Sequence, residues 1–170
     1  MYQANLFHDA FSRNAKFLGA GCFSSVYEMS NGTVVKVGCN DMTRNWLEFC
    51  QLHTAAGILK NFMPEVYSVV GIEENMYTAT MKKYSPFVED ENPQHTDVCA
   101  INTCHDIRLV EEEFSEYLRV VGYIYECGDR VFNDLHSGNV MFTDDRAIVI
   151  TDPSSARYWS MSYRPEFTLQ

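Results

Sequence analysis

The sequence of 170 residues predicts an α+β fold in which an antiparallel sheet comes first and a helical region follows. Runs of β-branched and aromatic residues, separated by hairpin signals, fill the first half of the chain. Patterns with helical spacing dominate the second half. The composition, 46% hydrophobic and 14% aromatic, suits a packed core. We therefore expect one domain, residues 1–170, with a sheet-bearing lobe over about 1–84 and a reduced helical lobe over 85–170.

The strands of the first half follow from local patterns. Residues 17–28 form two short strands around a glycine-containing turn. Asn31-Gly32 then predicts a second hairpin that leads into a strand at 33–37, because Asn-Gly is the strongest short hairpin signal. Two alternating segments at 66–72 and 76–81 add two more strands. The pattern predicts a five-stranded antiparallel sheet.

Helical spacing is clearest at residues 41–59, where Asn40 or Asp41 is a suitable N-cap. The apolar side of this helix would carry Trp46, Phe49, Cys50 and Leu52. Further helices are expected at residues 1–15, 97–108 and 111–127. Three glutamates, 111–113, begin the last of these, where negative charge suits the helix dipole. Residues 85–96 are expected to be a surface connection.

The most informative stretch runs from residue 131 to 153. Asn139 follows Asp134 by five residues, and Asp152 follows Asn139 by thirteen, with short strands expected at 139–142 and 147–150. Phosphoryl transfer requires a carboxylate that accepts the proton of the attacking hydroxyl, and an amide and a second carboxylate that hold magnesium against the nucleotide phosphates. The pattern predicts Asp134 as the catalytic base and Asn139 and Asp152 as ligands of Mg²⁺.

This stretch keeps the Asp, Leu and Asn of the protein-kinase catalytic loop, in Asp134, Leu135 and Asn139. The His and Arg that precede the Asp in that motif are absent. An ordinary polar loop between two strands is the alternative for this segment, because Asn, Asp and Gly are turn formers.

A second motif lies far upstream. Gly19 and Gly21 match the kinase glycine-rich loop, Ser24 stands at its third glycine, and Val26 would cover the adenine. Lys36 follows Gly21 by fifteen residues on the next strand and would reach the nucleotide phosphates. Taken separately, the glycines also suit an ordinary β-turn and the lysine a solvent face. Their order along the chain favours an ATP site.

Two further residues complete the predicted site. Glu48 is the acidic residue inside the helix at 41–59, and we expect it to pair with Lys36; a solvated Glu48 is the alternative. The adenine would hydrogen-bond to the main chain near Met81 to Tyr84, where the fifth strand ends.

Several pieces of the chain resemble the early serine/threonine protein kinase of T-seven-like short-tailed bacteriophages over roughly residues 11 to 157. The most specific pieces are His136-Ser137-Gly138-Asn139 and Ile150-Thr151-Asp152-Pro153. The resemblance implies a minimal two-lobed protein-kinase-like fold that uses ATP and Mg²⁺ to phosphorylate serine and threonine residues of host proteins, including transcription and RNA-processing machinery. Eighteen residues follow Asp152, so we expect a truncated second lobe without the family's separate host-shutoff region.

Two alternatives remain open. Aminoglycoside-type and other small-molecule phosphotransferases also carry an Asp-x-His loop, which His136 would match, although we expect this histidine to order the loop. A pseudokinase or binding module that occupies a host protein is the non-enzymatic alternative. A homodimer would supply surface that a short second lobe lacks.

Net charge and the composition of individual segments predict the kind of binding partner, the location of the protein and the state of its cysteines. The net charge of −10 disfavours direct nucleic-acid binding and would attract a basic protein target. The apolar runs are too short to span a membrane, and the first residues lack a signal-peptide pattern, so we expect the bacterial host cytoplasm. Six cysteines without a C-x-x-C pair are expected to be free thiols.

Overall fold

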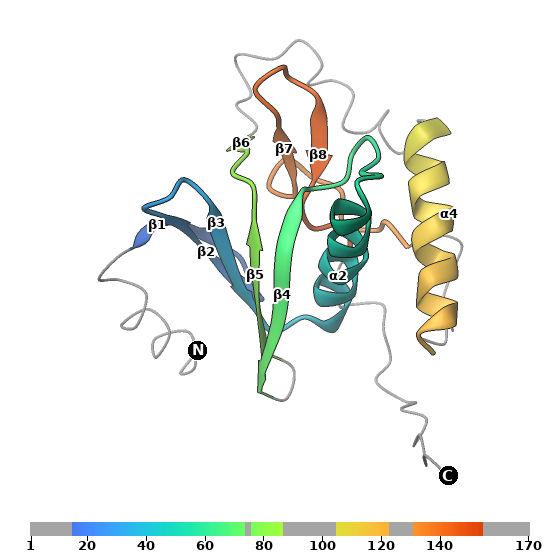
Figure 1. Cartoon of the computed structure of the whole chain (residues 1–170), viewed down its shortest axis with the longest axis horizontal. Helices are drawn as coiled ribbons and strands as arrows, with labels where there is room; N and C mark the ends of the chain where they lie inside the picture. Colours follow the sequence, from blue (N-terminus) through green and yellow to red (C-terminus); the bar gives the residue numbers. More distant parts are fainter. Residues whose placement is uncertain (1–14, 74–75, 87–104, 123–130, 155–170) are drawn as a thin grey trace.

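The computed structural model describes residues 15–73, 76–86, 105–122 and 131–154. Its main sheet has five antiparallel strands in the order β1-β2-β3-β5-β4 (Figure 1). These strands are β1 (Ala15–Ala20), β2 (Ser24–Met29), β3 (Val34–Gly38), β4 (Val66–Glu73) and β5 (Met76–Met81). The expected α+β class and the five-stranded antiparallel sheet are confirmed.

A second sheet of three strands has the order β6-β7-β8. It consists of β6 (Ser85–Pro86), β7 (Val140–Phe142) and β8 (Ile148–Ile150). The last two strands were expected, whereas β6 falls in the predicted surface connection. Its partner β7 lies more than 50 residues away along the chain, so no local pattern indicates the pairing. Pro86 is tolerated because β6 is an edge strand.

Helix α2 (Asp41–Ala56) begins where expected and ends earlier than residue 59. The side chain of Asn40 accepts a hydrogen bond from Met42 N at 2.9 Å, and Gly57 ends the helix in the left-handed conformation at φ 69°. Leu52 was expected on the apolar side but is 58% exposed. At 100° per residue it lies about 120° from Trp46 around the helix.

Helix α4 (His105–Val120) is continuous through residues 109 and 110, where a break between two helices was expected. No Gly or Pro interrupts this stretch, so the local sequence contains no helix breaker. Helical spacing predicts that Phe114, Leu118 and Val121 face inward; Phe114 and Leu118 are buried, but Val121, just beyond the helix, is 42% exposed. The expected helix at 1–15 and the parts of the other predicted helices at 97–104 and 123–127 lie outside the described residues.

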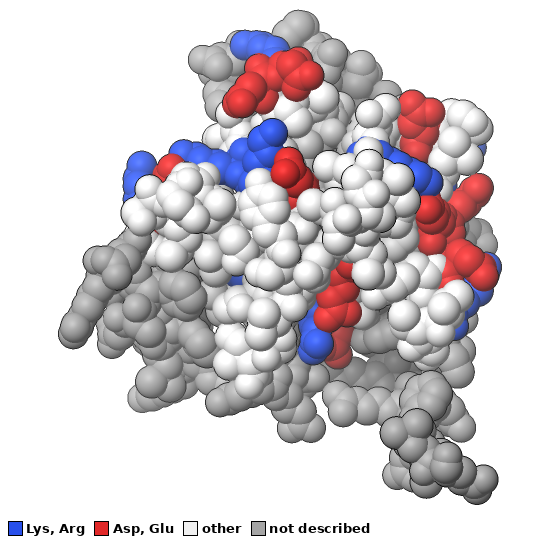
Figure 2. Space-filling view, in the orientation of Figure 1, with Lys and Arg blue, Asp and Glu red and all other residues white. Residues whose placement is uncertain are grey.

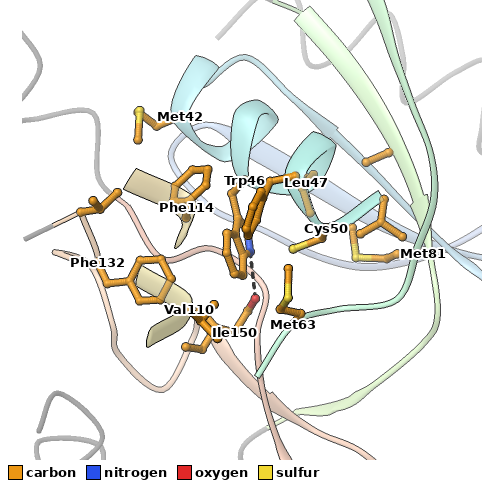
Figure 3. Close-up of a cluster of buried hydrophobic side chains, with 14 of the residues drawn as sticks. Met42, Trp46, Leu47, Cys50, Met63, Met81, Val110, Phe114, Phe132 and Ile150 are labelled. Carbon is orange, nitrogen blue, oxygen red and sulfur yellow. Dashed lines mark hydrogen bonds between the residues drawn. The ribbon is translucent and has the colours of Figure 1, made fainter. Parts of the chain in front are cut away.

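Helix α2 lies between the five-stranded sheet and α4 (Figure 1). Trp46 of α2 is fully buried at the centre of the main hydrophobic cluster, where it packs edge-on against Phe114 of α4 and Phe132 at centroid distances of 5.2 and 5.3 Å (Figure 3). Its indole Nε1 donates a hydrogen bond to Ile150 O at 3.0 Å (Figure 3). The cluster therefore joins the sheet, both helices and β8.

The expected boundary between the two lobes, near residue 84, falls in the link from β5 to β6. The main hydrophobic cluster contains residues from both sides of this link, including Val34 and Met81 from the sheet and Phe114 from α4. No helix in the part of the chain that the structure describes is long and apolar enough to cross a membrane.

Candidate active site

Asp152 follows β8 and is held by side chains from two other elements. Lys36 Nζ of β3 lies 2.8 Å from Asp152 Oδ2, and Thr43 Oγ1 of α2 donates a hydrogen bond to Asp152 Oδ1 at 2.8 Å. Each carboxylate oxygen thus has its own partner. The contacts join residues that are more than 100 positions apart in the sequence.

Lys36 does not face solvent, because it is only 6% exposed. Its strand lies inside the sheet, with Val26 of β2 opposite it on one side and Ala79 of β5 on the other. Its neighbour Val34, two residues earlier on the strand, belongs to the cluster that packs against α2. The alternation of the strand therefore directs Lys36 toward α2 and Asp152.

The expected ion pair between Lys36 and Glu48 does not form. Glu48 Oε1 instead accepts a hydrogen bond from Arg44 Nε at 2.8 Å, one helical turn earlier on α2. Five residues separate Thr43 from Glu48, which places their side chains about 140° apart around the helix. Because Thr43 faces Asp152, the helix phase turns Glu48 away from Lys36.

The loop that carries Asp134 and Asn139 is fixed by its own main chain. Asp134 N donates to Pro153 O at 3.0 Å, and Thr151 N donates to Asn139 O at 2.9 Å, so the loop is tied to the segment around Asp152. Asn139 Nδ2 donates to Asp134 O at 2.8 Å. The side chain of Asp134 is 39% exposed, and its Oδ2 accepts a longer hydrogen bond from Asn139 Nδ2 at 3.3 Å.

His136 makes contacts within the same loop. Its Nδ1 accepts a hydrogen bond from Gly138 N at 3.0 Å, and its Nε2 lies 3.0 Å from Asn139 Nδ2. That Nε2 lies 4.0 Å from Asp134 Oδ1, beyond hydrogen-bond distance. This geometry agrees with the loop-ordering role expected for His136.

Two buried side chains that were not predicted as site residues hydrogen-bond to the main chain just before the loop of Asp134. Glu111 Oε1 of α4 accepts a hydrogen bond from Phe132 N at 2.7 Å, and Ser154 Oγ donates to Val131 O at 2.7 Å. Glu111 was expected in the first turn of a helix, but it lies within α4 and is 8% exposed. Its partner is 21 residues away in the sequence, so helix periodicity alone does not identify it.

The donor set fits a magnesium ion. Asn139 uses its amide nitrogen for the contact with Asp134, which leaves its amide oxygen as a ligand. The Asp152 carboxylate is the second oxygen donor, and Mg²⁺ typically takes one or two side-chain oxygens together with nucleotide phosphates and water. The described residues contain no group of three or more His, Cys, Asp or Glu placed to hold a metal ion.

The glycine-containing turn between β1 and β2 is closed by a hydrogen bond from Gly21 N to Ser24 O at 2.8 Å. A Cβ added at Gly19 or Gly21 would meet no atom of the described residues within 4 Å. Val26 is half-buried and packs against the main hydrophobic cluster. The turn therefore leaves open space at the positions predicted to approach phosphate.

Met81 is buried at 4% exposure and lies between Val34 and Val66 in the sheet. Its main chain is flanked by strands on both sides, and Lys82 N also donates to the main chain, to Glu65 O at 3.0 Å. Tyr84 Oη accepts a hydrogen bond from Glu65 N at 2.8 Å, and burial raises the pKa of Tyr84 to about 12. Within residues 81–84, where adenine was predicted to hydrogen-bond to the main chain, the main chain near Tyr84 is therefore a better candidate than that of Met81.

Tyr77 of β5 lies beside the Asp152 contacts. Its ring covers Gly38, where an added Cβ would stand 2.5 Å from the Tyr77 hydroxyl oxygen. The hydroxyl is buried and has no hydrogen-bond partner among the described residues. Burial raises the pKa of Tyr77 well above its ordinary value, and the nearby Asp152 raises it further, so this phenol stays neutral. Neither Thr43 nor Tyr77 was singled out in the sequence; a glycine in a strand, Gly38, was the only local signal of close packing.

Comparison with known proteins yields one family. A family model described as bacteriophage T7 protein kinase 0.7 matches residues 10–164. Among solved structures, the GDP complex of a mutant aminoglycoside 2'-phosphotransferase-IIIa is similar, at 12% sequence identity and a TM-score of 0.44. The alignment covers 71% of this chain and 44% of that chain, so this chain spans less than half of that structure. No curated protein matches the chain.

Proposed function

The chain belongs to the bacteriophage T7 protein kinase family, and on this premise we propose that it is a protein kinase that transfers the γ-phosphate of ATP to serine and threonine side chains. The observation that carries the proposal is the contact between Lys36 and Asp152, at 2.8 Å, directly beside the loop of Asp134 and Asn139. A buried lysine paired with a carboxylate next to a second carboxylate and an amide is the side-chain set that phosphoryl transfer requires.

In the proposed reaction Asp134 orients the acceptor hydroxyl group and takes its proton. The hydroxyl oxygen forms a bond to the γ-phosphorus while the bond from that phosphorus to the β,γ-bridging oxygen breaks, and ADP leaves with the electron pair. The exposure of the Asp134 carboxylate supports this role, because the acceptor side chain of a protein must reach it from solvent.

Mg²⁺, when bound with the nucleotide, would neutralise the charge that develops on the phosphate oxygens. In this chain Asn139 and Asp152 would hold it. Lys36 would exchange part of its contact with Asp152 for the phosphates. The turn of Gly19, Gly21 and Ser24 would approach the same phosphates, and Val26 would cover the adenine.

We propose host proteins as the substrates, with transcription and RNA-processing machinery among them, as the family resemblance implies. The net charge of −10 supports an acceptor segment with basic residues, because opposite charges accelerate encounter. The place of action would be the bacterial host cytoplasm.

The test is transfer of labelled γ-phosphate from Mg-ATP into proteins of a bacterial lysate. We expect the wild type to label serine and threonine, and Asp134→Asn to reduce labelling by about 100-fold or more, because the general base is lost. Asp152→Asn should reduce it similarly. Asp144→Asn is the matched control, since Asp144 is an exposed residue of the turn between β7 and β8.

Other results would select other functions. Label that appears only on small hydroxylated molecules, such as an aminoglycoside added to the assay, would contradict the protein-kinase proposal in favour of a small-molecule phosphotransferase. Nucleotide binding without any transfer would instead favour a binding module.

A further inference from the structure

We propose that Thr43 is the residue through which α2 positions the metal-binding carboxylate of Asp152. The inference deepens the proposed function and rests on it. A kinase ordinarily uses a glutamate of this helix to hold the strand lysine. In this chain α2 instead holds Asp152, the partner of the strand lysine, and it does so through the hydroxyl group of Thr43.

The contact joins a buried hydroxyl group to a part-buried carboxylate. Thr43 is 1% exposed and its hydroxyl donates to Asp152 Oδ1 at 2.8 Å. A hydrogen bond to an ionised acceptor is stronger than a hydrogen bond between two neutral groups. Since Lys36 holds Oδ2 at the same distance, the carboxylate plane is fixed at both ends.

The same helix face also fixes the main chain just before Asp152. Thr43 and Trp46 are three residues apart and therefore lie on one side of α2. Trp46 Nε1 donates to Ile150 O at 3.0 Å, two residues before Asp152 (Figure 3). Two hydrogen bonds from one rigid element thus set both the path of this segment and the direction of its carboxylate.

Thr43 is the contact that remains when nucleotide binds. Lys36 must turn toward the phosphates, which releases Oδ2, whereas Thr43 has no role at the phosphates and keeps Oδ1. Tyr77 does not replace it, because its buried hydroxyl lies beside Thr43 and makes no hydrogen bond to Asp152. Thr43 would therefore keep the carboxylate oriented for Mg²⁺ during the exchange.

The test measures how binding of a fluorescent ADP analogue depends on Mg²⁺ concentration. We expect Thr43→Val, which keeps the shape and removes the hydroxyl, to raise the half-saturating Mg²⁺ concentration about 10-fold, the low end for loss of a group that orients a metal ligand. Thr43→Ser keeps the hydroxyl and should restore the wild-type value. Thr80→Val is the matched control, because Thr80 lies on β5 with its side chain directed to the other face of the sheet from Tyr77.

An unchanged Mg²⁺ requirement in folded Thr43→Val would overturn the inference, even if its melting temperature fell, because that result describes a purely structural residue. If Thr43→Val does not fold, Thr43→Ala carries the same expectation. A wild type whose nucleotide binding is independent of Mg²⁺ would overturn the proposed function together with the inference, so the two failures are distinguishable.

Discussion

At the scale of single residues, the pair of Lys36 and Asp152 is the most informative contact in the molecule. The lysine is nearly fully buried, and the side chain of Asp152 is 20% exposed. Removing one partner of a buried pair leaves an uncompensated charge, which costs about 3–5 kcal/mol in fully buried examples and less where water reaches one group. A buried lysine at this position therefore makes stability depend on its partner, which agrees with a proposed role in binding phosphate.

Gly21→Ala separates a phosphate-binding loop from an ordinary turn. A Cβ at this position meets no atom of the described part of the chain within 4 Å, so the free energy of unfolding should stay within about 0.5 kcal/mol of wild type. If ATP phosphates approach the backbone here, the methyl group will intrude and the Kd for ATP will rise. Calorimetric titration with Mg-ATP and thermal unfolding measure the two effects.

Gly38→Ala is the contrasting variant. The added Cβ would stand 2.5 Å from the buried hydroxyl oxygen of Tyr77, and the ring must shift, which should cost about 1–3 kcal/mol of stability. For the Gly21→Ala variant, a Kd for ATP equal to that of wild type would contradict a phosphate-binding loop and favour an ordinary β-turn between β1 and β2.

At the scale of elements, α4 supports the site through two neighbouring glutamates with different surroundings. Glu111 is buried and accepts a hydrogen bond from the main chain of Phe132, just before the loop that carries Asp134. Glu113 is part-exposed and joins α4 to α2 by accepting from His53 Nε2 at 3.1 Å, and it also contacts Lys60. Acidic side chains gather over α4 on the face shown in Figure 2. The helix thus uses similar residues to hold a loop and to hold its neighbouring helix.

Glu113→Gln should remove stability in a pH-dependent way. Partial burial raises the pKa of Glu113, but hydrogen bonds and charge from Lys60 and His53 outweigh it, and the net pKa is lowered. A lowered carboxyl pKa means that its stabilisation is complete above the unfolded value of 4.5 and is lost as pH falls through the folded value. We expect a loss of about 0.5 kcal/mol at pH 7, since the carboxylate is part-exposed.

Urea unfolding of wild type and variant at pH 7 and at pH 3 measures this difference. The gap between the two proteins should be smaller at pH 3 than at pH 7, because more of Glu113 is then protonated in both states. Glu112→Gln is the control, because the neighbouring Glu112 is exposed. A gap between Glu113→Gln and wild type that widens on acidification would contradict the assigned sign.

At the scale of the whole molecule, one hydrophobic cluster runs from the five-stranded sheet through α2 to α4 and on to Phe132 and Ile150. A separate and smaller cluster covers the opposite face of the sheet around Tyr27 and Met76. The first cluster contains residues from both proposed lobes. The parts that carry Lys36 and Asp134 are therefore packed against a common core.

This continuity predicts a single unfolding transition. Phe114→Leu, a change in α4 that removes ring contacts with Trp46, should destabilise the sheet and the helices together by about 1–3 kcal/mol. Far-ultraviolet circular dichroism and intrinsic tryptophan fluorescence, followed during urea unfolding, should shift to the same midpoint. Two separate transitions would show instead that the proposed lobes unfold independently.

The sequence alone determined the family, the α+β class and all five strands of the main sheet. These features depend on local information: Asn31-Gly32 sets a hairpin, alternation sets β4 and β5, and Asn40 sets the start of α2. The predicted roles of Asp134, Asn139 and Asp152 rest on motif spacing and remain proposals that the kinase assay tests.

Only the tertiary structure decided which side chains meet. The phase of α2 relative to β3 places Thr43 rather than Glu48 toward Asp152, and the approach of α4 buries Glu111 under the catalytic loop. Helical periodicity defines the faces of a helix but does not say which of them turns toward a strand that is distant in sequence. That choice follows from how Trp46 fills the core between the sheet and α4, a property of the packed molecule as a whole.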